Sequence, residues 1–418
     1  MELTRLRGFR DLVGADARAM SLVEERARAL VERYSMKEIR IPVLERTQLY
    51  LRSTGETSDI VEKQMYTFTD RDEGETVVAL RPEGTPGVVR AYIEAGFDRT
   101  EPQQRLFYSG AMFRRERPQK GRYRQFYQFG VEVFGRPDAA CDAEILIMID
   151  ELCRDLKVPF TMEINSIGDQ KCRPAFRDAL VQWGRTHWDE LCDDCHNRID
   201  RNPLRLLDCK IDAKLAASAP NSLDYLCDEC RAHFDTVKEL ASAGGVEYVV
   251  NPRMVRGLDY YTRTAFEVMA GGLGAQSTVV AGGRYDGLVE TMGGAAVAGI
   301  GFAIGVDRMA LALQAAGVAP TAAPDAAIIA MGPAATRHAI AVARNLREAN
   351  LNVEMLSPER KMKTLLARAS KIGARFAVII GDDELARGVV QVRDLKQSTQ
   401  REVAVAEAAR AIADARGE

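Results

Sequence analysis

The sequence lacks a hydrophobic run long enough to cross a membrane. Its longest uncharged apolar stretch, residues 295–306, is well short of the roughly 20 residues that a membrane-spanning helix needs. The first residues carry charged side chains, among them Arg5, Arg7 and Arg10, and no continuous apolar segment follows them, which excludes a secretory signal. We therefore expect a cytoplasmic protein with no membrane association.

An excess of one charge is also absent. The 418 residues include 57 Lys and Arg and 60 Asp and Glu, a formal net charge of −3, which excludes a uniformly basic protein that coats nucleic acid. The hydrophobic fraction of 46% and the charged fraction of 28% are typical of globular proteins and exclude a disordered, collagen-like or coiled-coil chain. At roughly 150 residues per domain, the length predicts about three domains.

A change of composition near residue 320 predicts a domain boundary. Residues 315–327 are rich in Ala and Pro, and we place a linker at residues 319–325. From Asp325 to the end, 15 basic and 12 acidic residues give a net charge of +3. Strands are expected at residues 326–331, 352–356, 376–380 and 389–393, and helices at 334–349, 362–372 and beyond Val405. This alternation predicts a small α/β domain at residues 326–418 with a mostly parallel sheet.

Before the linker, the sequence predicts a mixed core that is interrupted by an insertion. Apolar residues recur at helical spacing over residues 16–34, and residues 39–43 alternate as in a strand, with Pro42 suggesting an edge or interface position. Further along, this alternation gives way to paired cysteines and helix-like runs. We therefore predict a core made of residues 1–168 and 246–318, with a helical insertion at residues 169–245.

A basic hairpin lies between residues 105 and 135. Residues 114–124 hold six basic side chains and one acidic one, and two aromatic-rich strands flank a turn at residues 118–121. Because side chains of a strand alternate between its two faces, each strand is expected to present one set of residues together. The first set is Tyr108, Met112, Arg114 and Glu116, and the second is Arg122, Phe126, Gln128, Gly130 and Glu132.

If these two faces coincide, one sheet surface suits a nucleotide polyphosphate together with a small cationic ligand. Arginine binds phosphate through charge-assisted and often bidentate hydrogen bonds. Phe126 could stack on a base, and Gly130 would let a ligand approach the backbone. Glu132 lies among apolar neighbours, where a carboxylate requires an N–H donor or a cation. The alternative is a solvated basic hairpin, because an exposed face alternates in the same way.

The hairpin resembles motif 2 of class II aminoacyl-tRNA synthetases, with Arg114-Arg115-Glu116 followed by a basic residue, Arg122, and then Phe126. Residues 39–45 resemble motif 1, and residues 299–308, a glycine-rich stretch that ends at Arg308, resemble motif 3. Two more stretches resemble motifs specific to the histidyl-tRNA synthetase family. They are RGLDYY at residues 256–261 and GGRYDGL at residues 282–288, and the stretches at residues 7–11 and 80–85 also match that family.

The resemblance covers nearly the whole chain and implies an α+β fold. Its parts are the antiparallel class II catalytic sheet at residues 1–168 and 246–318, the helical insertion and a C-terminal α/β anticodon-binding domain. The implied activity is the ATP-dependent ligation of L-histidine to its cognate histidine tRNA through a histidyl-adenylate, performed by a homodimer with Pro42 at its interface. Positioning and electrostatic stabilisation supply most of the rate of such a reaction.

The resemblance also implies roles for individual residues. Arg114 and Arg256 are expected at the α-phosphate of ATP, and Arg122 and Arg308 at the γ-phosphate, with Mg²⁺ on the β- and γ-phosphates. Glu116 would bind the adenine amino group and Phe126 would stack on the ring. For histidine, Glu83 and Thr85 would hold the ammonium group with Gln128 beside them, and Gly84 would also belong to the site. Glu132 and Tyr261 would bond the ring nitrogens, and Tyr260 and Tyr285 would wall the pocket. Arg117 and Gln119 would face the acceptor end of the tRNA.

Two CxxC pairs, Cys192 with Cys195 and Cys227 with Cys230, are separated by 31 residues. Four thiolates in such pairs suit a tetrahedral structural Zn²⁺, which the family resemblance does not require. The alternative is a cluster of reduced thiols in a small helical core. The four histidines lie outside the catalytic motifs and are interpreted as surface or insertion residues: His187, His196, His233 and His338.

Three alternatives to a histidine-specific ligase remain at this point. The first is a non-catalytic regulatory subunit that is similar to histidyl-tRNA synthetase, the second is a tRNA-sensing binding module, and the third is a class II synthetase for proline or threonine. Regulatory relatives usually lack the anticodon domain and have a degraded RGLDYY stretch, whereas both are intact here. Amino-acid-dependent exchange between ATP and pyrophosphate separates all of these readings.

Overall fold

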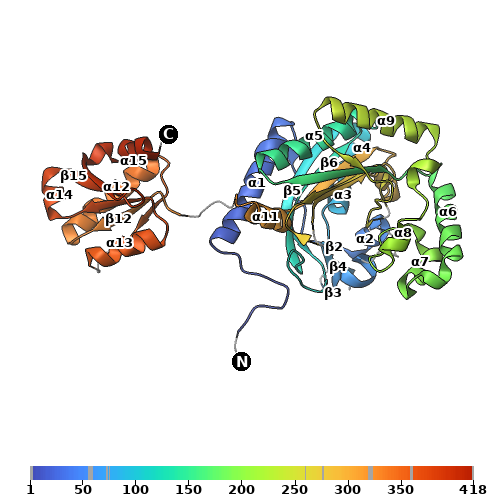
Figure 1. Ribbon diagram of the computed structural model, residues 1–418, viewed down its shortest axis with the longest axis horizontal. Helices are drawn as coiled ribbons and strands as arrows, with labels where there is room; N and C mark the ends of the chain where they lie inside the picture. The colour runs from blue at the N-terminus through green and yellow to red at the C-terminus, as the bar shows by residue number, and fades with distance from the viewer. Residues whose placement is uncertain are drawn as a thin grey trace. The chain divides into compact units, whose positions relative to one another are not determined.

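The computed structural model describes residues 3–54, 60–71, 74, 76–258, 260–274, 277–318, 323–357 and 361–416. Residues 319–322 of the predicted linker and Asp259 of the RGLDYY stretch lie outside this part of the chain. The chain forms two compact units, Met1–Pro320 and Thr321–Glu418, each with its own hydrophobic core (Figure 1). Among the described helices, none is long and apolar enough to span a membrane.

An eight-stranded sheet forms the centre of the larger unit. Its strands are, in spatial order, β1 (Lys37–Glu38), β5 (Gln104–Phe113), β6 (Gln125–Phe134), β11 (Gly299–Gly305), β10 (Thr278–Arg284), β9 (Thr262–Ala270), β7 (Phe160–Ser166) and β8 (Val249–Val250). Neighbouring strands run antiparallel, except that the two-residue edge strands β1 and β8 pair in parallel with β5 and β7. The predicted antiparallel catalytic sheet is therefore confirmed.

Helices cover both faces of this sheet. One face packs the main core against α1 (Ala15–Arg33), α5 (Ala139–Asp155), α9 (Asp228–Ala243) and α11 (Val306–Ala315). The other face packs a second core against α3 (Thr85–Glu94) and α10 (Leu288–Thr291), near the short α4 (Phe97–Thr100). A small sheet of β2 (Leu44–Arg46), β4 (Thr76–Leu80) and β3 (Tyr66–Asp70) accompanies α2 (Thr47–Thr54) and a π-helix at Ile60–Gln64.

The described elements between residues 169 and 245 are all helical. They are α6 (Arg173–Thr186), α7 (Asp193–Arg201), α8 (Ala213–Ala216) and α9, with 3₁₀ turns at Trp188–Glu190, Pro203–Leu206 and Ser222–Tyr225. Phe176, Leu180, Ile199 and Leu206 form a core that belongs to this segment alone. The segment therefore has its own interior, while α9 also packs on the main core.

The smaller unit contains a five-stranded sheet with helices on both faces. The strand order is β13 (Val353–Met355), β12 (Ala326–Ala330), β14 (Phe376–Ile380), β15 (Val389–Asp394) and β16 (Thr399–Ala404). The helices are α12 (Pro333–Glu348), α13 (Met362–Lys371), α14 (Asp382–Arg387) and α15 (Ala408–Arg416). The prediction of a mostly parallel sheet was wrong, because β12 is parallel to β13 and β14 but β15 is antiparallel to both β14 and β16. Asp394 shapes its turn by accepting hydrogen bonds from the amides of Lys396 and Gln397.

The strand predicted over residues 39–43 does not form. Pro42 has no N–H to donate to a ladder, so β1 ends before it and β2 begins after it. The carbonyl groups of Ile41 and Pro42 instead accept hydrogen bonds from Nη1 of Arg81, at 2.8 and 3.3 Å. Arg81 is 5% exposed, so a buried side chain from the next motif replaces the missing strand partner.

Strand β11 shows why the glycine-rich stretch is needed. Its large residues, Ile300, Phe302 and Ile304, face the main core beneath α1 and α11. Its small residues, including Gly301 and Gly305, face the opposite side and line a cleft. The alternation of large and small side chains therefore fills one face of the sheet and leaves space on the other.

Candidate active site

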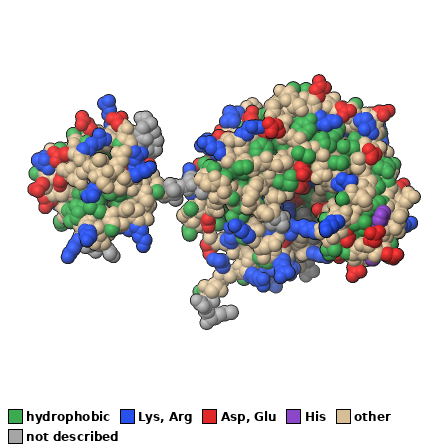
Figure 2. All heavy atoms as spheres, viewed as in Figure 1, with side chains coloured by type: hydrophobic (Ala, Val, Ile, Leu, Met, Phe, Trp, Pro, Cys, Tyr) green, Lys and Arg blue, Asp and Glu red, His purple; other side chains and the backbone are tan. Residues whose placement is uncertain are grey.

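A cleft that is open to solvent lies on the sheet face that the small residues of β11 leave free. The register of β5 and β6 pairs Tyr108 with Gly130 and Met112 with Phe126, so the two side-chain sets of the hairpin do share one face. On the visible side of the larger unit, Figure 2 shows a hollow with Lys and Arg side chains gathered along one edge. The hairpin face is therefore a wall of a cleft and not a solvated surface.

Nearly all the residues predicted to bind histidine or ATP line this cleft. They are Glu83, Thr85, Arg114, Glu116, Arg122, Phe126, Gln128, Arg256, Tyr260, Tyr261, Tyr285 and Arg308. Two predicted residues, Gly84 and Glu132, do not line it. Glu132 is 1% exposed and lies behind Thr85 and Tyr285, whose hydroxyl groups donate to its two carboxylate oxygens.

The end of the cleft near α3 offers two acceptor oxygens without partners. Oε1 of Glu83 and Oε1 of Gln128 are buried and have no hydrogen-bond partner, while Oε2 of Glu83 accepts from the hydroxyl of Tyr260 at 2.9 Å. Burial raises the pKa of Glu83 to about 7, against the opposing effect of nearby Arg114. Buried acceptors in native proteins are almost always satisfied, so this pair fits a ligand that brings N–H donors.

Glu132 is a buried carboxylate whose described hydrogen-bond partners are neutral. Thr85 donates to it at 2.7 Å and Tyr285 donates to its other oxygen. Burial raises the pKa of Glu132 to about 8, because the hydrogen bonds from Tyr285 and Thr85 offset only part of the loss of hydration. A cationic or N–H-bearing ligand beside this carboxylate would favour its ionised form.

Tyr108 fills the space that two glycines leave open. A Cβ atom on either Gly84 or Gly130 would overlap the ring of Tyr108, which is 2% exposed. The prediction that Gly130 lets a ligand approach the backbone is therefore wrong, since the tyrosine ring occupies that space. Gly84 has the same role on the other side of the ring, and its place in the structure is behind the cleft wall.

The arginine-rich end of the cleft gathers three guanidinium groups, and one of them, Arg114, also lies beside Glu83. Nε of Arg308 donates to the carbonyl of Gly121 and Nη1 to that of Thr278, both at 3.0 Å. Burial lowers the pKa of Arg308, and the positive charges of Arg122 and Arg114 lower it further. Because arginine stays charged at working pH, a cluster of mutually repelling guanidinium groups is a binding site for a polyanion.

Two more contacts shape this end. Nε of Arg122 lies 3.2 Å from Oε2 of Glu116, and the guanidinium of Arg114 lies 5.2 Å from the centre of the Phe126 ring. Arg122 and Arg114 are thus positioned by Glu116 and Phe126, the two residues predicted to bind adenine. An aromatic face beside a basic cluster suits a nucleotide, whose base stacks while its phosphates pair with arginine.

Arg256 lies at the cleft wall with 12% of its side chain exposed. It forms an ion pair with Glu267 of β9, and its guanidinium lies 5.3 Å from the centre of the Tyr261 ring. The insertion supports the same stretch of chain. Arg205 donates to the carbonyl of Gly257, and Arg173 donates to that of Tyr261 at 3.0 Å.

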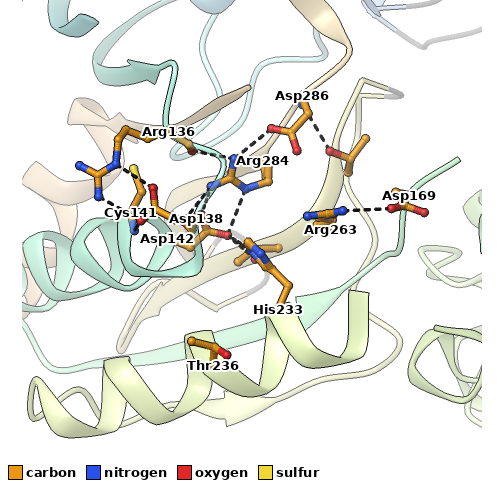
Figure 3. A network of polar contacts seen from close by, with 12 residues as sticks. Arg136, Asp138, Cys141, Asp142, Asp169, His233, Thr236, Arg263, Arg284 and Asp286 are labelled. Atoms are coloured by element: carbon orange, nitrogen blue, oxygen red, sulfur yellow. Dashed lines mark hydrogen bonds and ion pairs between the residues drawn. The ribbon is translucent and has the colours of Figure 1, made fainter. Parts of the chain in front are cut away.

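Sequence reasoning missed a buried network behind the site (Figure 3). Arg284, in the GGRYDGL stretch, is fully buried and pairs with Asp142 of α5 and, at 3.0 Å, with Asp286. Asp142 also lies 2.8 Å from Nε2 of His233 on α9 and accepts from Thr264 at 2.6 Å. His233 lies in the insertion, as predicted, but its side chain is only 9% exposed and takes part in this network, which was not predicted. The one available signal was an aspartate within an apolar helix.

A second missed contact ties the N-terminal segment to the motif 3 helix. Arg10 forms an ion pair with Asp307, whose other oxygen accepts from the amide of Tyr127 at 2.7 Å. Arg10 also lies over the ring of Tyr123, 3.4 Å from its centre. The RGFRD stretch therefore packs on the hairpin beside Arg308.

The four cysteines predicted as one zinc site do not meet. Cys192 and Cys195 cluster with Cys209 and Asp212, whereas Cys227 and Cys230 cluster with Asp169 and Cys172. The spacing within each pair was read correctly, but spacing cannot tell which pairs meet in space. A single site of four thiolates is therefore excluded.

An antiparallel sheet that carries a basic hairpin, a glycine-rich strand and an arginine-lined cleft defines a class II aminoacyl-tRNA synthetase. The chain belongs to the histidyl-tRNA synthetase family: the family profile described as "Histidyl-tRNA synthetase" matches residues 8–168 and 196–309. The profile described as "Anticodon binding domain" matches residues 325–415.

Full-length relatives and solved structures agree with this assignment. The histidine–tRNA ligase of Desulforamulus reducens is 44% identical over 412 residues, which cover 97% of this chain and 98% of that protein. The histidine–tRNA ligase of Geobacter sulfurreducens is 46% identical over 404 residues, 96% of this chain and 97% of that protein. The crystal structure of the apo histidyl-tRNA synthetase of S. aureus superposes with a TM-score of 0.78 at 33% identity, over 98% of this chain and 100% of that one.

Proposed function

We infer that this chain ligates L-histidine to its cognate tRNA at the expense of ATP, through a histidyl-adenylate. One observation carries the inference. A single cleft joins two unpaired buried acceptor oxygens, on Glu83 and Gln128, to the guanidinium cluster of Arg114, Arg122 and Arg308. An amino acid and ATP bound at these two ends would meet, carboxylate to α-phosphate, between them.

At the histidine end, Oε1 of Glu83 and Oε1 of Gln128 accept from the α-ammonium group. Tyr261 bonds one ring nitrogen and Glu132 the other, which requires Thr85 or Tyr285 to release its hydrogen bond to Glu132 when histidine binds. Tyr260 and Tyr285 wall the pocket. The carboxylate of Glu132 supports this role, because it is buried among neutral donors and gains from a ring N–H. Other amino acids would leave these polar groups unpaired, which is a strong basis for rejection.

At the ATP end, Arg122 and Arg308 bind the γ-phosphate and Arg114 binds the α-phosphate, with Phe126 stacked on adenine and Glu116 on its amino group. Arg256 approaches the α-phosphate from the other wall, where it neutralises charge as the carboxylate attacks. Enzymes of this family use ATP with Mg²⁺. The described carboxylates of the cleft are engaged by Arg122, Arg10 and Tyr260, so Mg²⁺ would be held mainly by phosphate oxygens and water, as this ion prefers.

The tRNA is bound by both units. Arg117 and Gln119 are exposed at the hairpin turn, which two backbone hydrogen bonds between Gln119 and Arg122 close at 2.9 and 3.0 Å. They face the acceptor end, while the unit at residues 326–418 binds the anticodon through salt-dependent contacts. We place the catalytic core at residues 1–168 and 246–318, the insertion at 169–245 and the linker at 319–325.

We also propose a cytoplasmic homodimer that pairs through motif 1. Leu44 and Phe68 share one face of the small sheet and are 44% and 47% exposed, and Val43, just before the sheet, is 41% exposed. Apolar groups gathered in this way are typical of a surface that another chain covers.

The test is exchange of pyrophosphate into ATP, measured with each amino acid in turn. Histidine alone should support exchange. Exchange that depends on proline or threonine, or none with any amino acid, would overturn the assignment, and the second outcome would favour a regulatory subunit. A structure described as an ATP phosphoribosyltransferase regulatory subunit/histidyl-tRNA synthetase from Bacillus halodurans shares the fold, with a TM-score of 0.66 at 20% identity.

A further inference from the structure

The insertion contains two separate groups of potential metal ligands. The Asp169 cluster consists of Asp169, Cys172, Cys227 and Cys230, and the Asp212 cluster consists of Cys192, Cys195, Cys209 and Asp212. Within each cluster, one donor atom from every residue lies within 4.8 Å of the others. Half of the eight residues fall in residues 169–195, which the family profile does not match.

Both clusters are built in the same way. In each, a CxxC pair begins a helix, with its first cysteine at the N-cap of α9 or α7 and its second in the first turn. In each, a second pair with the same spacing supplies one aspartate and one cysteine. These pairs are Asp169 with Cys172 and Cys209 with Asp212. Two independent occurrences of one arrangement indicate a shared purpose, and paired ligands at this spacing are the usual construction of structural zinc sites.

The distances fit four ligands around one ion. Sγ of Cys172 lies 3.8 Å from Sγ of Cys230, and Sγ of Cys192 lies 3.7 Å from Sγ of Cys209. A Zn–S bond of about 2.3 Å sets the edge of a tetrahedral site at about 3.8 Å, whereas a disulfide needs about 2.05 Å. Two thiols in simple contact would be equally far apart. The convergence of four donors at each place is what distinguishes a metal site from such a contact.

Backbone groups orient the ligands. The amide of Asp169 donates to Sγ of Cys172 at 3.3 Å, and the amide of Asp212 donates to Sγ of Cys209 at 3.5 Å. The amide of Cys192 donates to Oδ2 of Asp212 at 3.1 Å, which brings the two pairs of that cluster together. Such contacts fix the position of metal ligands before the ion arrives.

We propose that each cluster binds one Zn²⁺ ion through three thiolates and one carboxylate, so that the chain carries two structural zinc ions. Each set of four negative ligands is closed and leaves no position for substrate, and neither cluster lines the cleft. The ions therefore stabilise the insertion and take no part in the chemistry.

The clusters lie next to the residues that support the RGLDYY stretch. Arg173, which follows Cys172, donates to the carbonyl of Tyr261, and Arg263 lies 3.4 Å from Asp169 (Figure 3). Arg205, from the turn before Cys209, donates to the carbonyl of Gly257. Each zinc ion thus anchors one end of the segment that places Arg256 and Tyr261, a consequence that rests on the proposed function of that segment.

The first test is the metal content of the full-length protein after washing with a chelator. Elemental analysis should find two zinc ions per chain. Cys195→Ser and Cys230→Ser should each remove one ion and together should remove both, whereas Cys153→Ala, a buried cysteine of α5 outside both clusters, should keep two. Zinc below about 0.2 per chain, another metal, or a total of one ion per chain that either variant alone removes would overturn the proposal. If the chain holds one zinc ion in total and only one of the two variants removes it, the cluster of the other variant does not bind zinc.

A second test uses the unmodified chain and does not depend on whether the variants fold. A mercurial reagent that titrates thiols should release two zinc ions as it modifies the six cluster cysteines. Mass spectrometry of the intact chain should show all eight cysteines reduced. Disulfides between Cys172 and Cys230 or between Cys192 and Cys209 would overturn the proposal.

The consequence for the active site is tested by removing zinc and then adding zinc alone. Removal should raise the KM for histidine more than the KM for ATP, and re-addition should restore it. If zinc is present but no amino acid supports exchange, the proposed function fails while the metal sites stand. If exchange is histidine-specific and no zinc is found, only the metal sites fail.

Discussion

Gly301 faces the carboxylate of Glu132 across two neighbouring strands, so closely that a Cβ atom at position 301 would overlap Oε2 of Glu132. The motif 3 glycine therefore makes room for a buried acid beside the proposed histidine pocket. The two residues lie in different motifs, and neither motif alone reveals the contact.

Gly301→Ala should damage histidine binding more than ATP binding. The added methyl group overlaps Oε2 of Glu132 and the backbone oxygen of Val131. It displaces Glu132 and disturbs the hydrogen bonds with Thr85 and Tyr285, so the KM for histidine should rise about tenfold or more. Steady-state exchange kinetics measure this. Gly287→Ala is the matched control, since nothing lies within 4 Å of a Cβ atom there. An equal rise in both KM values would indicate general misfolding instead.

Glu132→Gln should change how stability depends on pH. The pKa of Glu132 is raised by burial to about 8, whereas that of an unfolded glutamate is about 4.5. Its contribution to the stability of the ligand-free protein is complete below pH 4.5 and is lost as the pH rises towards 8. The glutamine side chain does not titrate. The unfolding free energy of the variant minus that of the wild type should therefore increase with pH, by up to about 1.4 kcal/mol per pH unit across this range.

Urea denaturation between pH 5 and 8 provides the measurement. The exposed Glu247→Gln is the control and should show no such trend. A difference between wild type and Glu132→Gln that stays constant with pH would contradict the buried, proton-binding carboxylate.

Histidine binding should release a proton from Glu83. Burial raises the pKa of Glu83 to about 7, so below pH 7 the carboxyl group is mostly protonated before the ligand arrives. The ammonium group of histidine favours the ionised form, and affinity should therefore increase as the pH rises through 7. Calorimetry at pH 6.5 in two buffers with different ionisation enthalpies counts the protons. Glu83→Gln should bind more weakly and lose this proton, and equal release from both proteins would refute the role.

Arg256→Ala should slow adenylate formation about 100-fold or more while histidine binding stays measurable, because the lost guanidinium acts where charge develops. The substitution also leaves Glu267 without its ion-pair partner. Arg256→Ala combined with Glu267→Gln separates these effects, since the double variant should remain slow. Recovery of exchange in the double variant would show that the unpaired carboxylate caused the defect, and unchanged turnover in the single variant would dismiss the role entirely.

Removal of residues 324–418 should abolish tRNA charging while largely preserving histidine-dependent exchange. The two units have separate hydrophobic cores, so the larger one should fold without the smaller. The measurement compares tRNA charging with pyrophosphate exchange on the same preparation of the truncated protein. Parallel losses would mean that the boundary is misplaced or that the adenylate site needs the C-terminal unit.

Local patterns predicted the parts of the site that local rules determine. The period-two alternation of β6 placed Phe126, Gln128 and Glu132 on one face, because successive side chains of a strand point to opposite faces. Most elements of the C-terminal unit were predicted within a residue or two, since its central strands are continuous buried runs. The hairpin of β15 and β16 was not predicted, because β16 is mostly exposed and lacks an apolar pattern.

Contacts between distant segments could not be predicted. Asp142 meets His233 and Arg284, which lie 91 and 142 residues further along the chain, and no spacing rule connects them. Pro42 ended the predicted strand in a way that depends on Arg81 from another motif. Each CxxC pair lies beside a pair made of one aspartate and one cysteine and not beside the other CxxC pair. Which pairs lie together depends on the tertiary structure, which the spacing of cysteines does not reveal.

The most direct measurement is a crystal structure with histidinol and ATP bound together. We expect the ammonium group within hydrogen-bond distance of Oε1 of Glu83 and Oε1 of Gln128, and the triphosphate among Arg114, Arg122 and Arg308. A ligand that leaves those two oxygens unpaired, or a triphosphate bound away from the three guanidinium groups, would contradict the account.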